Sequence, residues 1–387
     1  MTISRRTLLR RVGAGAAAMR AVAPALPQTS PLAALLAASA SSSGATAARE
    51  TIRLNRNESA YGPSSRAIAA MQEAAAQAAF RYPDVESDAL RARIASLHRI
   101  TRDQVLLGCG ASELLKAAVD TFVGRGEKIV TSLPTFEVIG RCAQRAKVNV
   151  VAVPLARDCS HDLDAMLARI DSATRLVYIS NPNNPSGMVT CRHELEMFLR
   201  RLPPTTYVLI DEAYHHYVDP SPNYGSFIDR PVDDPRVVAV RTFSKIYGLA
   251  GLRIGYAVAA SDTTRLLASR LVTEDVNIVA RKAALAALDD SEHVRTSASR
   301  NTHDRQEFFN QAMGRMLRVI DSQTNFVMVK TGRPADEILE HFTKNRVLLS
   351  GPFPGFPTYV RVSLGTPDDM REFWRVWDLL GIHHTAM

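Results

Sequence analysis

Residues 237–256 read Val-Val-Ala-Val-Arg-Thr-Phe-Ser-Lys-Ile-Tyr-Gly-Leu-Ala-Gly-Leu-Arg-Ile-Gly-Tyr. In this stretch a β-branched apolar run ends abruptly in Thr242, Ser244 and Lys245. Such a run is typical of a strand buried on both faces, and a lysine just past its end costs desolvation free energy unless something uses it. One use is imine formation with an aldehyde cofactor, because apolar surroundings lower the pKa of the amine. The alternative is a strand-end lysine that merely reaches water.

Arg253 lies eight residues after Lys245, beyond a Gly-Leu-Ala-Gly turn that lets the backbone fold back. Two hydroxyls, those of Thr242 and Ser244, and this guanidinium could therefore converge on one phosphate, since charge-assisted hydrogen bonds suit that group.

Length and charge limit the possible classes of protein. A chain of 387 residues forms one or two domains. The net charge is +8, but residues 1–47 contain five arginines and no acid, and removing these five leaves +3 for the remainder. No cluster of basic side chains marks a nucleic-acid surface. The four cysteines, none of them in a Cys-x-x-Cys pair, do not indicate a metal site.

Residues 1–47 differ in kind from the rest of the chain. A start containing Arg5 and Arg6 precedes a short apolar run and then Ser-, Ala- and Pro-rich residues. This pattern predicts a Tat signal peptide and linker, hence a folded protein that is periplasmic or otherwise exported through the Tat translocon. The apolar run is too short for a stable membrane span. A cytoplasmic protein with a disordered tail is the alternative.

Several other segments repeat the pattern of an apolar strand followed by chemically informative residues. These residues are Gly108, Phe136, Asn184, Asp211 and, as above, Lys245. In an open α/β sheet the carboxyl ends of the strands form the ligand crevice, so these residues are expected to meet there. After Gly108 the amides of Ala111 and Ser112 open a helix, where free N–H groups favour an anion.

The motif Thr-x-Ser-Lys-x-x-Gly-Leu-Ala-Gly-Leu-Arg-x-Gly-Tyr resembles the cofactor-lysine motif of the class I/II pyridoxal-phosphate aminotransferases, in the histidinol-phosphate aminotransferase branch. Further segments match that family in order, from about Leu54 to about Thr366, including Arg81-Tyr-Pro-Asp84 and Asn181-Pro-Asn-Asn-Pro-Ser-Gly187. The resemblance implies an α/β fold of the aspartate-aminotransferase type, with a large mixed-sheet domain and a small α+β domain. The expected divisions are an N-terminal arm at 48–79, a large domain at 80–285 and a small domain at 286–387.

The resemblance also implies a binding site for pyridoxal 5'-phosphate. Its residues would be Gly110, Ala111, Ser112, Phe136, Asn184, Asp211, Tyr214, Thr242, Ser244, Lys245 and Arg253, with Tyr82 reaching in from the neighbouring subunit of a homodimer. Lys245 would move the proton, Asp211 would pair with the pyridine nitrogen, and Tyr214 and Asn184 would hold the ring oxygen. Arg361 would take the substrate carboxylate, with Tyr61 and Asn184 beside the substrate. Phe136 stands where the family usually has tyrosine or tryptophan, and it cannot donate a hydrogen bond.

The reaction so implied is transfer of an amino group from an amino acid or similar donor to a 2-oxo acid. Decarboxylation, lyase chemistry and racemisation use the same fold, and an exported binding protein is a further alternative. The family usually has a second arginine twelve or thirteen residues before the carboxylate arginine, where it holds a substrate phosphate. Here those positions are Leu348 and Leu349, and an apolar loop follows. An unphosphorylated substrate is therefore expected, and a true histidinol-phosphate aminotransferase is the alternative.

Export generates the first testable prediction. Replacing both arginines, Arg5→Lys with Arg6→Lys, should leave the protein in the cytoplasm, because the Tat route reads the arginine pair itself rather than its charge. Cell fractionation with immunoblotting measures the outcome. Unchanged export of the double variant would contradict the prediction.

Overall fold

The computed structural model describes residues 50–82, 84–229, 234–271 and 276–381. The predicted signal peptide, residues 1–47, lies outside these ranges. Thr51–Met387 forms a compact unit of its own, and the following description concerns that unit.

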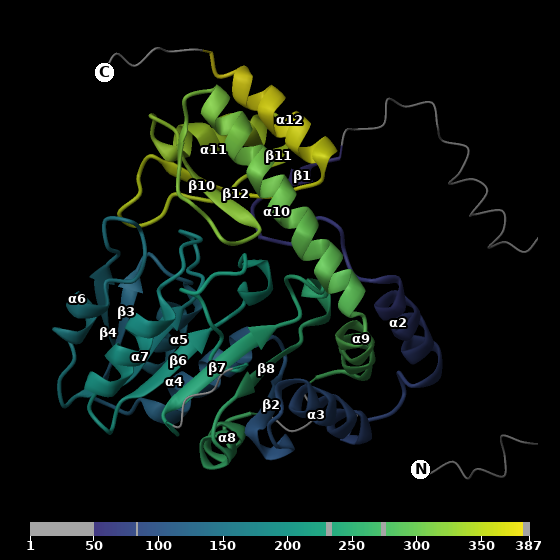
Figure 1. Cartoon of the computed structure of the whole chain (residues 1–387), viewed down its shortest axis with the longest axis vertical. Coiled ribbons are helices and arrows are strands. Elements are labelled where there is room, and N and C mark those ends of the chain that lie inside the picture. Colours follow the sequence, from purple (N-terminus) through teal and green to yellow (C-terminus); the bar gives the residue numbers. More distant parts are fainter. Residues whose placement is uncertain (1–49, 83, 230–233, 272–275, 382–387) are drawn as a thin grey trace, which may run out of the picture. The chain divides into compact units, whose positions relative to one another are not determined.

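A seven-stranded sheet occupies the centre of the unit (Figure 1). Its strands, in spatial order, are β2 (Val105–Gly108), β8 (Gly255–Val258), β7 (Val237–Thr242), β6 (Tyr207–Asp211), β5 (Thr174–Ser180), β3 (Lys128–Leu133) and β4 (Asn149–Pro154). Strand β8 runs antiparallel to both β2 and β7, whereas the pairs from β7 to β4 are all parallel. The sheet is therefore mixed, as predicted.

Helices cover both faces of this sheet, which explains why its strands are apolar throughout. One face packs against α4 (Ala111–Phe122), α5 (Val138–Ala146) and α8 (Ser261–Ala268). The other packs against α2 (Ser65–Gln77), α3 (Asp84–His98), α6 (Leu163–Leu167), α7 (Arg192–Arg201) and α9 (Ile278–Leu288). Ser64 caps α2, as its residue type and position suggest, by accepting a hydrogen bond from the Ala67 amide at 3.1 Å.

A second core belongs to the C-terminal part of the chain. The antiparallel sheet there has the order β12 (Tyr359–Ser363), β10 (Phe326–Lys330), β9 (Arg318–Val319). It packs with α10 (Ser291–Gly314), α11 (Ala335–Lys344) and α12 (Pro367–Asp378) around Phe373 and other aromatic rings. Figure 1 shows α10 running from beside α9 to these C-terminal elements.

The start of the described chain joins that second core. Strand β1 (Ile52–Arg53) pairs in parallel with β11 (Val347–Leu348), and Leu54 is buried in the C-terminal core. The sequence did not reveal this pairing, because strand pairing between distant segments leaves no local signal.

The next residues, 55–63, pass over the loop that carries Lys245. Gly248 lies so close to Gly62 that a Cβ at Gly248 would collide with the Gly62 carbonyl group. This contact explains the glycine at position 248, whose φ of +68° also suits glycine.

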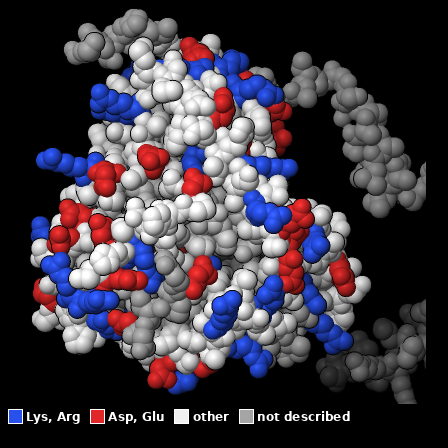
Figure 2. All heavy atoms as spheres, in the orientation of Figure 1, with Lys and Arg blue, Asp and Glu red and all other residues white. Residues whose placement is uncertain are grey.

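The predicted fold class is confirmed. The predicted domain divisions stay predictions. No helix in the described ranges is long and apolar enough to cross a membrane. On the face shown in Figure 2, basic and acidic side chains are interspersed.

Candidate active site

Lys245 lies in the loop just after β7 (Val237–Thr242), a strand in the interior of the large sheet. Its Nζ donates hydrogen bonds to two backbone oxygens of the arm, that of Asn57 at 2.8 Å and that of Arg56 at 3.2 Å. Burial, with a contribution from Arg361, lowers the pKa of Lys245 to about 7. Near neutral pH a large fraction of this amine is therefore uncharged, which is the form that attacks a carbonyl carbon.

Asp211 ends the neighbouring strand β6 and is buried. One carboxylate oxygen accepts a hydrogen bond from the Tyr178 hydroxyl at 3.0 Å, and the other accepts one from the Ala213 amide at 3.0 Å. Burial raises the pKa of Asp211 to about 6, while these two donors and the Lys245 charge oppose the rise. A buried carboxylate so placed would gain from a cationic partner such as a protonated ring nitrogen.

Tyr214 lies three residues beyond Asp211, and its ring is 5.3 Å from Lys245 Nζ. The Tyr214 oxygen accepts a hydrogen bond from the Asn57 side-chain amide at 3.0 Å and a longer one from that of Asn184 at 3.5 Å. Burial raises the pKa of Tyr214 to about 12, so the phenol keeps its proton near neutral pH.

The predicted phosphate cradle forms where β2 turns into α4. Gly110 is the N-cap of α4 with φ +79°, and a Cβ there would collide with the Arg253 guanidinium. The guanidinium also reaches the Ser244 hydroxyl at 3.5 Å. The Thr242 hydroxyl, by contrast, accepts a hydrogen bond from the Ser244 backbone amide at 3.0 Å. The helix N-terminus at Ala111 thus lies next to a guanidinium, an arrangement that suits a phosphate dianion.

Phe136 lies in the loop after β3, partly buried against the core that includes α4 and α5. Its packing is that of an ordinary core aromatic, and stacking on a ring stays a prediction.

Arg361 points from β12 into the same region. Its guanidinium donates to the Asn184 side-chain oxygen and, at 2.9 Å, to the Asn55 backbone oxygen. Its Nε is buried and has no hydrogen-bond partner among the described residues. Arginine keeps its charge even though burial lowers the pKa of Arg361. A buried guanidinium with an unused N–H is suited to a carboxylate.

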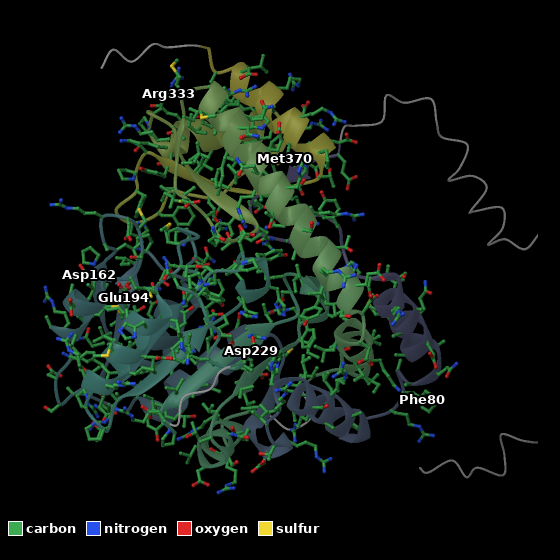
Figure 3. All side chains as sticks on the ribbon, viewed as in Figure 1. Phe80, Asp162, Glu194, Asp229, Arg333 and Met370 are labelled. Atoms are coloured by element: carbon green, nitrogen blue, oxygen red, sulfur yellow. The ribbon has the colours of Figure 1, made fainter. Side chains whose placement is uncertain are left out.

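Two predicted site residues make other contacts. The Tyr61 hydroxyl donates to Asp304 of α10 at 2.7 Å, and the Arg300 guanidinium lies 5.1 Å from the Tyr61 ring. Tyr82 is 84% exposed, and nearby Phe80 is also exposed at the margin of the molecule (Figure 3). The substrate role of Tyr61 and the contact of Tyr82 with a neighbouring subunit stay predictions.

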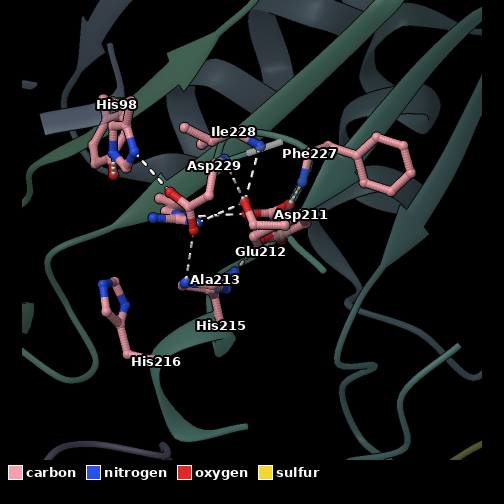
Figure 4. Close-up of polar contacts among 12 residues, drawn as sticks. His98, Asp211, Glu212, Ala213, His215, His216, Phe227, Ile228 and Asp229 are labelled. Atoms are coloured by element: carbon pink, nitrogen blue, oxygen red, sulfur yellow. Dashed lines mark hydrogen bonds and ion pairs between the residues drawn. The ribbon is translucent and has the colours of Figure 1, made fainter. Parts of the chain in front are cut away.

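A buried polar cluster lies next to β6 and β7, the strands that lead to Asp211 and Lys245. Arg241 of β7 pairs with Glu212 at 3.1 Å and with Asp229 at 2.9 Å. Asp229 also contacts His98 at 2.8 Å and His215 at 3.3 Å (Figure 4). Because side chains alternate along a strand, Arg241 points away from the face of Thr242. The cluster therefore joins β6, β7 and α3 without occupying the crevice.

Sequence reasoning missed four residues of the site: Asn57, Tyr178, Asn325 and Ser363. Asn57 and Asn325 lie beside Lys245, since Asn325 donates to the Asn57 oxygen at 3.2 Å. Asn57 belongs to the segment Leu54-Asn-Arg-Asn-Glu58, where the family resemblance begins, and this segment was a usable signal. Tyr178 and Ser363 lie in strands, where an inward polar residue does not stand out in the sequence.

The comparisons with known proteins agree with this geometry. The family model for aminotransferases of class I and II matches residues 49–376. The chain belongs to the class I and II aminotransferases. This aminotransferase is 36% identical over 317 residues to a histidinol-phosphate aminotransferase of Shouchella clausii, covering 81% of this chain and 85% of that protein. It is 38% identical over 330 residues to one of Symbiobacterium thermophilum, with coverage of 84% and 89%.

Solved structures give the same result for the fold of this aminotransferase. The histidinol-phosphate aminotransferase from Sinorhizobium meliloti, solved in complex with pyridoxal-5'-phosphate, matches with a TM-score of 0.80 and 28% identity, over 86% of this chain and 92% of that one. Aspartate aminotransferase from Thermus thermophilus with maleate matches in fold, with a TM-score of 0.73 and 20% identity, over 84% and 92%.

The anion cradle of this aminotransferase generates a second prediction. Gly110→Ala should weaken binding of inorganic phosphate about tenfold or more, because the new Cβ displaces Arg253 and one charge-assisted hydrogen bond is worth roughly 1.5–3 kcal/mol. Isothermal titration calorimetry with phosphate measures the affinity. Gly126→Ala is the matched control, since Gly126 also has positive φ but open space around its Cα. Equal losses in both variants would show that backbone strain, and not the cradle, is responsible.

Proposed function

We propose that this aminotransferase uses pyridoxal phosphate to transfer the amino group of an unphosphorylated amino donor to a 2-oxo acid. The observation that carries the proposal is the Lys245 amine, with its pKa of about 7, at a strand end beside Asp211, Tyr214 and Arg361. The cofactor is supported by the family and by the pyridoxal-5'-phosphate in the Sinorhizobium meliloti structure.

The residues present fit this cofactor. Arg253, Ser244 and the amides at the start of α4 would hold its phosphate, Asp211 its ring nitrogen, and Tyr214 with Asn184 its ring oxygen. When bound, pyridoxal phosphate supplies an aldehyde that exchanges amines and a ring that accepts electrons.

The chain's own side chains would supply binding and proton transfer. Lys245, as the free amine, is placed to accept a proton at Nζ and to return it, and a pKa near neutrality suits both steps. Asp211 would favour a proton on the ring nitrogen of the bound cofactor, because burial makes an unpaired carboxylate costly. Arg361 would bind the substrate carboxylate through its forked N–H groups and so orient the amine toward Lys245.

The preference for an unphosphorylated donor rests on the surroundings of Arg361. Leu349 is buried in the C-terminal core, and Leu348 of β11 pairs with Arg53 of β1. The loop after them returns to β12 through a bridge between Ser350 and Arg361. The Phe353 ring lies 5.5 Å from the Arg361 guanidinium. An aromatic ring near the carboxylate site favours an uncharged substrate side chain over a phosphate dianion.

A true histidinol-phosphate aminotransferase is the second candidate, because the relatives at 36% and 38% identity are named for that activity. It requires the substrate phosphate to find its partners elsewhere than at positions 348 and 349.

We also propose that the chain works as an exported homodimer. The exposed Phe80 and Tyr82 side chains support an association surface next to α2. A native mass of twice the subunit mass would verify the dimer. Export rests on residues 1–47 alone.

Labelling provides the third prediction. Borohydride reduction of the protein incubated with pyridoxal phosphate should fix the label on Lys245, and peptide mapping by mass spectrometry identifies the site. The initial rate of labelling should rise with pH through about 7, because the neutral amine reacts and its fraction grows as pH rises past the pKa. Lys245→Ala should abolish the label at this position, while Lys330→Ala, which changes an exposed lysine, should not. Main labelling elsewhere contradicts the assignment.

The fourth prediction concerns the donor. In a panel of amino donors with 2-oxoglutarate or pyruvate as acceptor, unphosphorylated amino acids with aromatic or aliphatic side chains should show the highest kcat/KM. Loss of one charge-assisted hydrogen bond costs a phosphorylated donor about tenfold or more. A kcat/KM for histidinol phosphate about a hundredfold above every other donor would establish the second candidate. Release of carbon dioxide or racemisation without acceptor would instead indicate another reaction on the same fold.

A further inference from the structure

Asn57 of the arm forms hydrogen bonds through both its backbone and its side chain. It is 1% exposed and has φ +53°, a left-handed conformation that asparagine tolerates better than most residues. Its backbone oxygen accepts a hydrogen bond from Lys245 Nζ at 2.8 Å. Its side chain bridges Ser363 of β12 and Tyr214. One residue therefore contacts both the amine and the phenol of the proposed site.

The contacts of the Ser363 hydroxyl and the Asn57 amide together set the direction of these hydrogen bonds. The Asn57 backbone N–H donates to Ser363 Oγ at 2.8 Å. The Ser363 hydroxyl in turn lies 3.0 Å from Asn57 Oδ1 and donates to it. With Oδ1 satisfied by this donor, the side-chain NH2 faces Tyr214 and donates to its oxygen at 3.0 Å.

This order of donors has a consequence for the Tyr214 proton. Among the described residues, the Tyr214 oxygen accepts hydrogen bonds from the side-chain amide nitrogens of Asn57 and Asn184. A phenol oxygen that accepts from these neighbours must direct its own O–H away from them.

We propose that Asn57, oriented by Ser363, is a positioning residue that makes Tyr214 a hydrogen-bond donor to the ring oxygen of the cofactor. The inference rests on the proposed function, because it needs a bound pyridoxal phosphate. It assigns to the arm a role in tuning the cofactor. It also connects the hydrogen bonding of the ring oxygen to β12, the strand of Arg361, which would bind the substrate carboxylate. Ser363 and Arg361 lie two residues apart on one face of that strand.

The test is a spectrophotometric pH titration of bound pyridoxal phosphate. Asn57→Gly removes the side chain, tolerates positive φ and keeps both backbone groups. A donor to the ring oxygen favours the deprotonated, more negative chromophore, so losing an oriented donor should raise the pKa of the absorbance change. We expect a rise of about 0.5 to 1 pH unit, the shift that corresponds to one neutral hydrogen bond.

A double-mutant cycle with Tyr214→Phe separates positioning from a structural effect. If Asn57 acts through Tyr214, Asn57→Gly should add less than about 0.2 unit in the Tyr214→Phe background. Asn325→Ala is the matched control, because the Asn325 side chain donates to the backbone oxygens of Asn57 and Glu58, at 3.2 and 3.1 Å, rather than to Tyr214. Its effect should be the same in both backgrounds.

Ser363→Ala is the second variant and leaves position 57 intact. It should shift the pKa in the same direction by a smaller amount, and it decides the matter if Asn57→Gly does not fold. Full additivity of Asn57→Gly with Tyr214→Phe, or an unshifted pKa in both Asn57→Gly and Ser363→Ala, overturns the inference. A wild-type protein that binds no pyridoxal phosphate would instead overturn the proposed function.

Discussion

The burial of one amine at the end of an apolar strand is the constraint on which the rest of the site depends. Strand β7 is buried along its whole length, and Lys245 follows it into a region where a charged ammonium is costly. Two backbone oxygens of the arm stabilise the ammonium form, while burial favours the neutral amine. The balance places its pKa near neutrality, where an amine can both attack and carry a proton.

Two sets of contacts surround the strand and loop that carry this amine. On the crevice side, the arm passes over the lysine loop in contact close enough to require Gly248. Within the sheet, Arg241, Glu212 and Asp229 pair in a buried cluster that joins β7 to the chain after β6 (Figure 4). Removing one partner of such a pair would leave an uncompensated buried charge, which is strongly destabilising.

The site also joins the two cores of the compact unit. Arg361 and Ser363 come from β12, whereas Lys245, Asp211 and Tyr214 come from the large sheet. The arm segment at Asn55 and Asn57 contacts both groups. A change at the carboxylate site therefore has a short hydrogen-bonded route to the amine and the phenol.

The sequence by itself determined the strand ends that carry Asp211 and Lys245, the glycine turn before α4 and the aminotransferase fold, because apolar runs, glycine turns and the lysine motif are local patterns. The tertiary structure alone decided the pairing of β1 with β11, the antiparallel strand β8, and the meeting of Asn57 with Ser363 across 306 positions. It also decided that the Tyr61 hydroxyl donates a hydrogen bond to Asp304. The physical reason is that contacts between distant segments depend on how whole elements pack, and no local spacing records that packing.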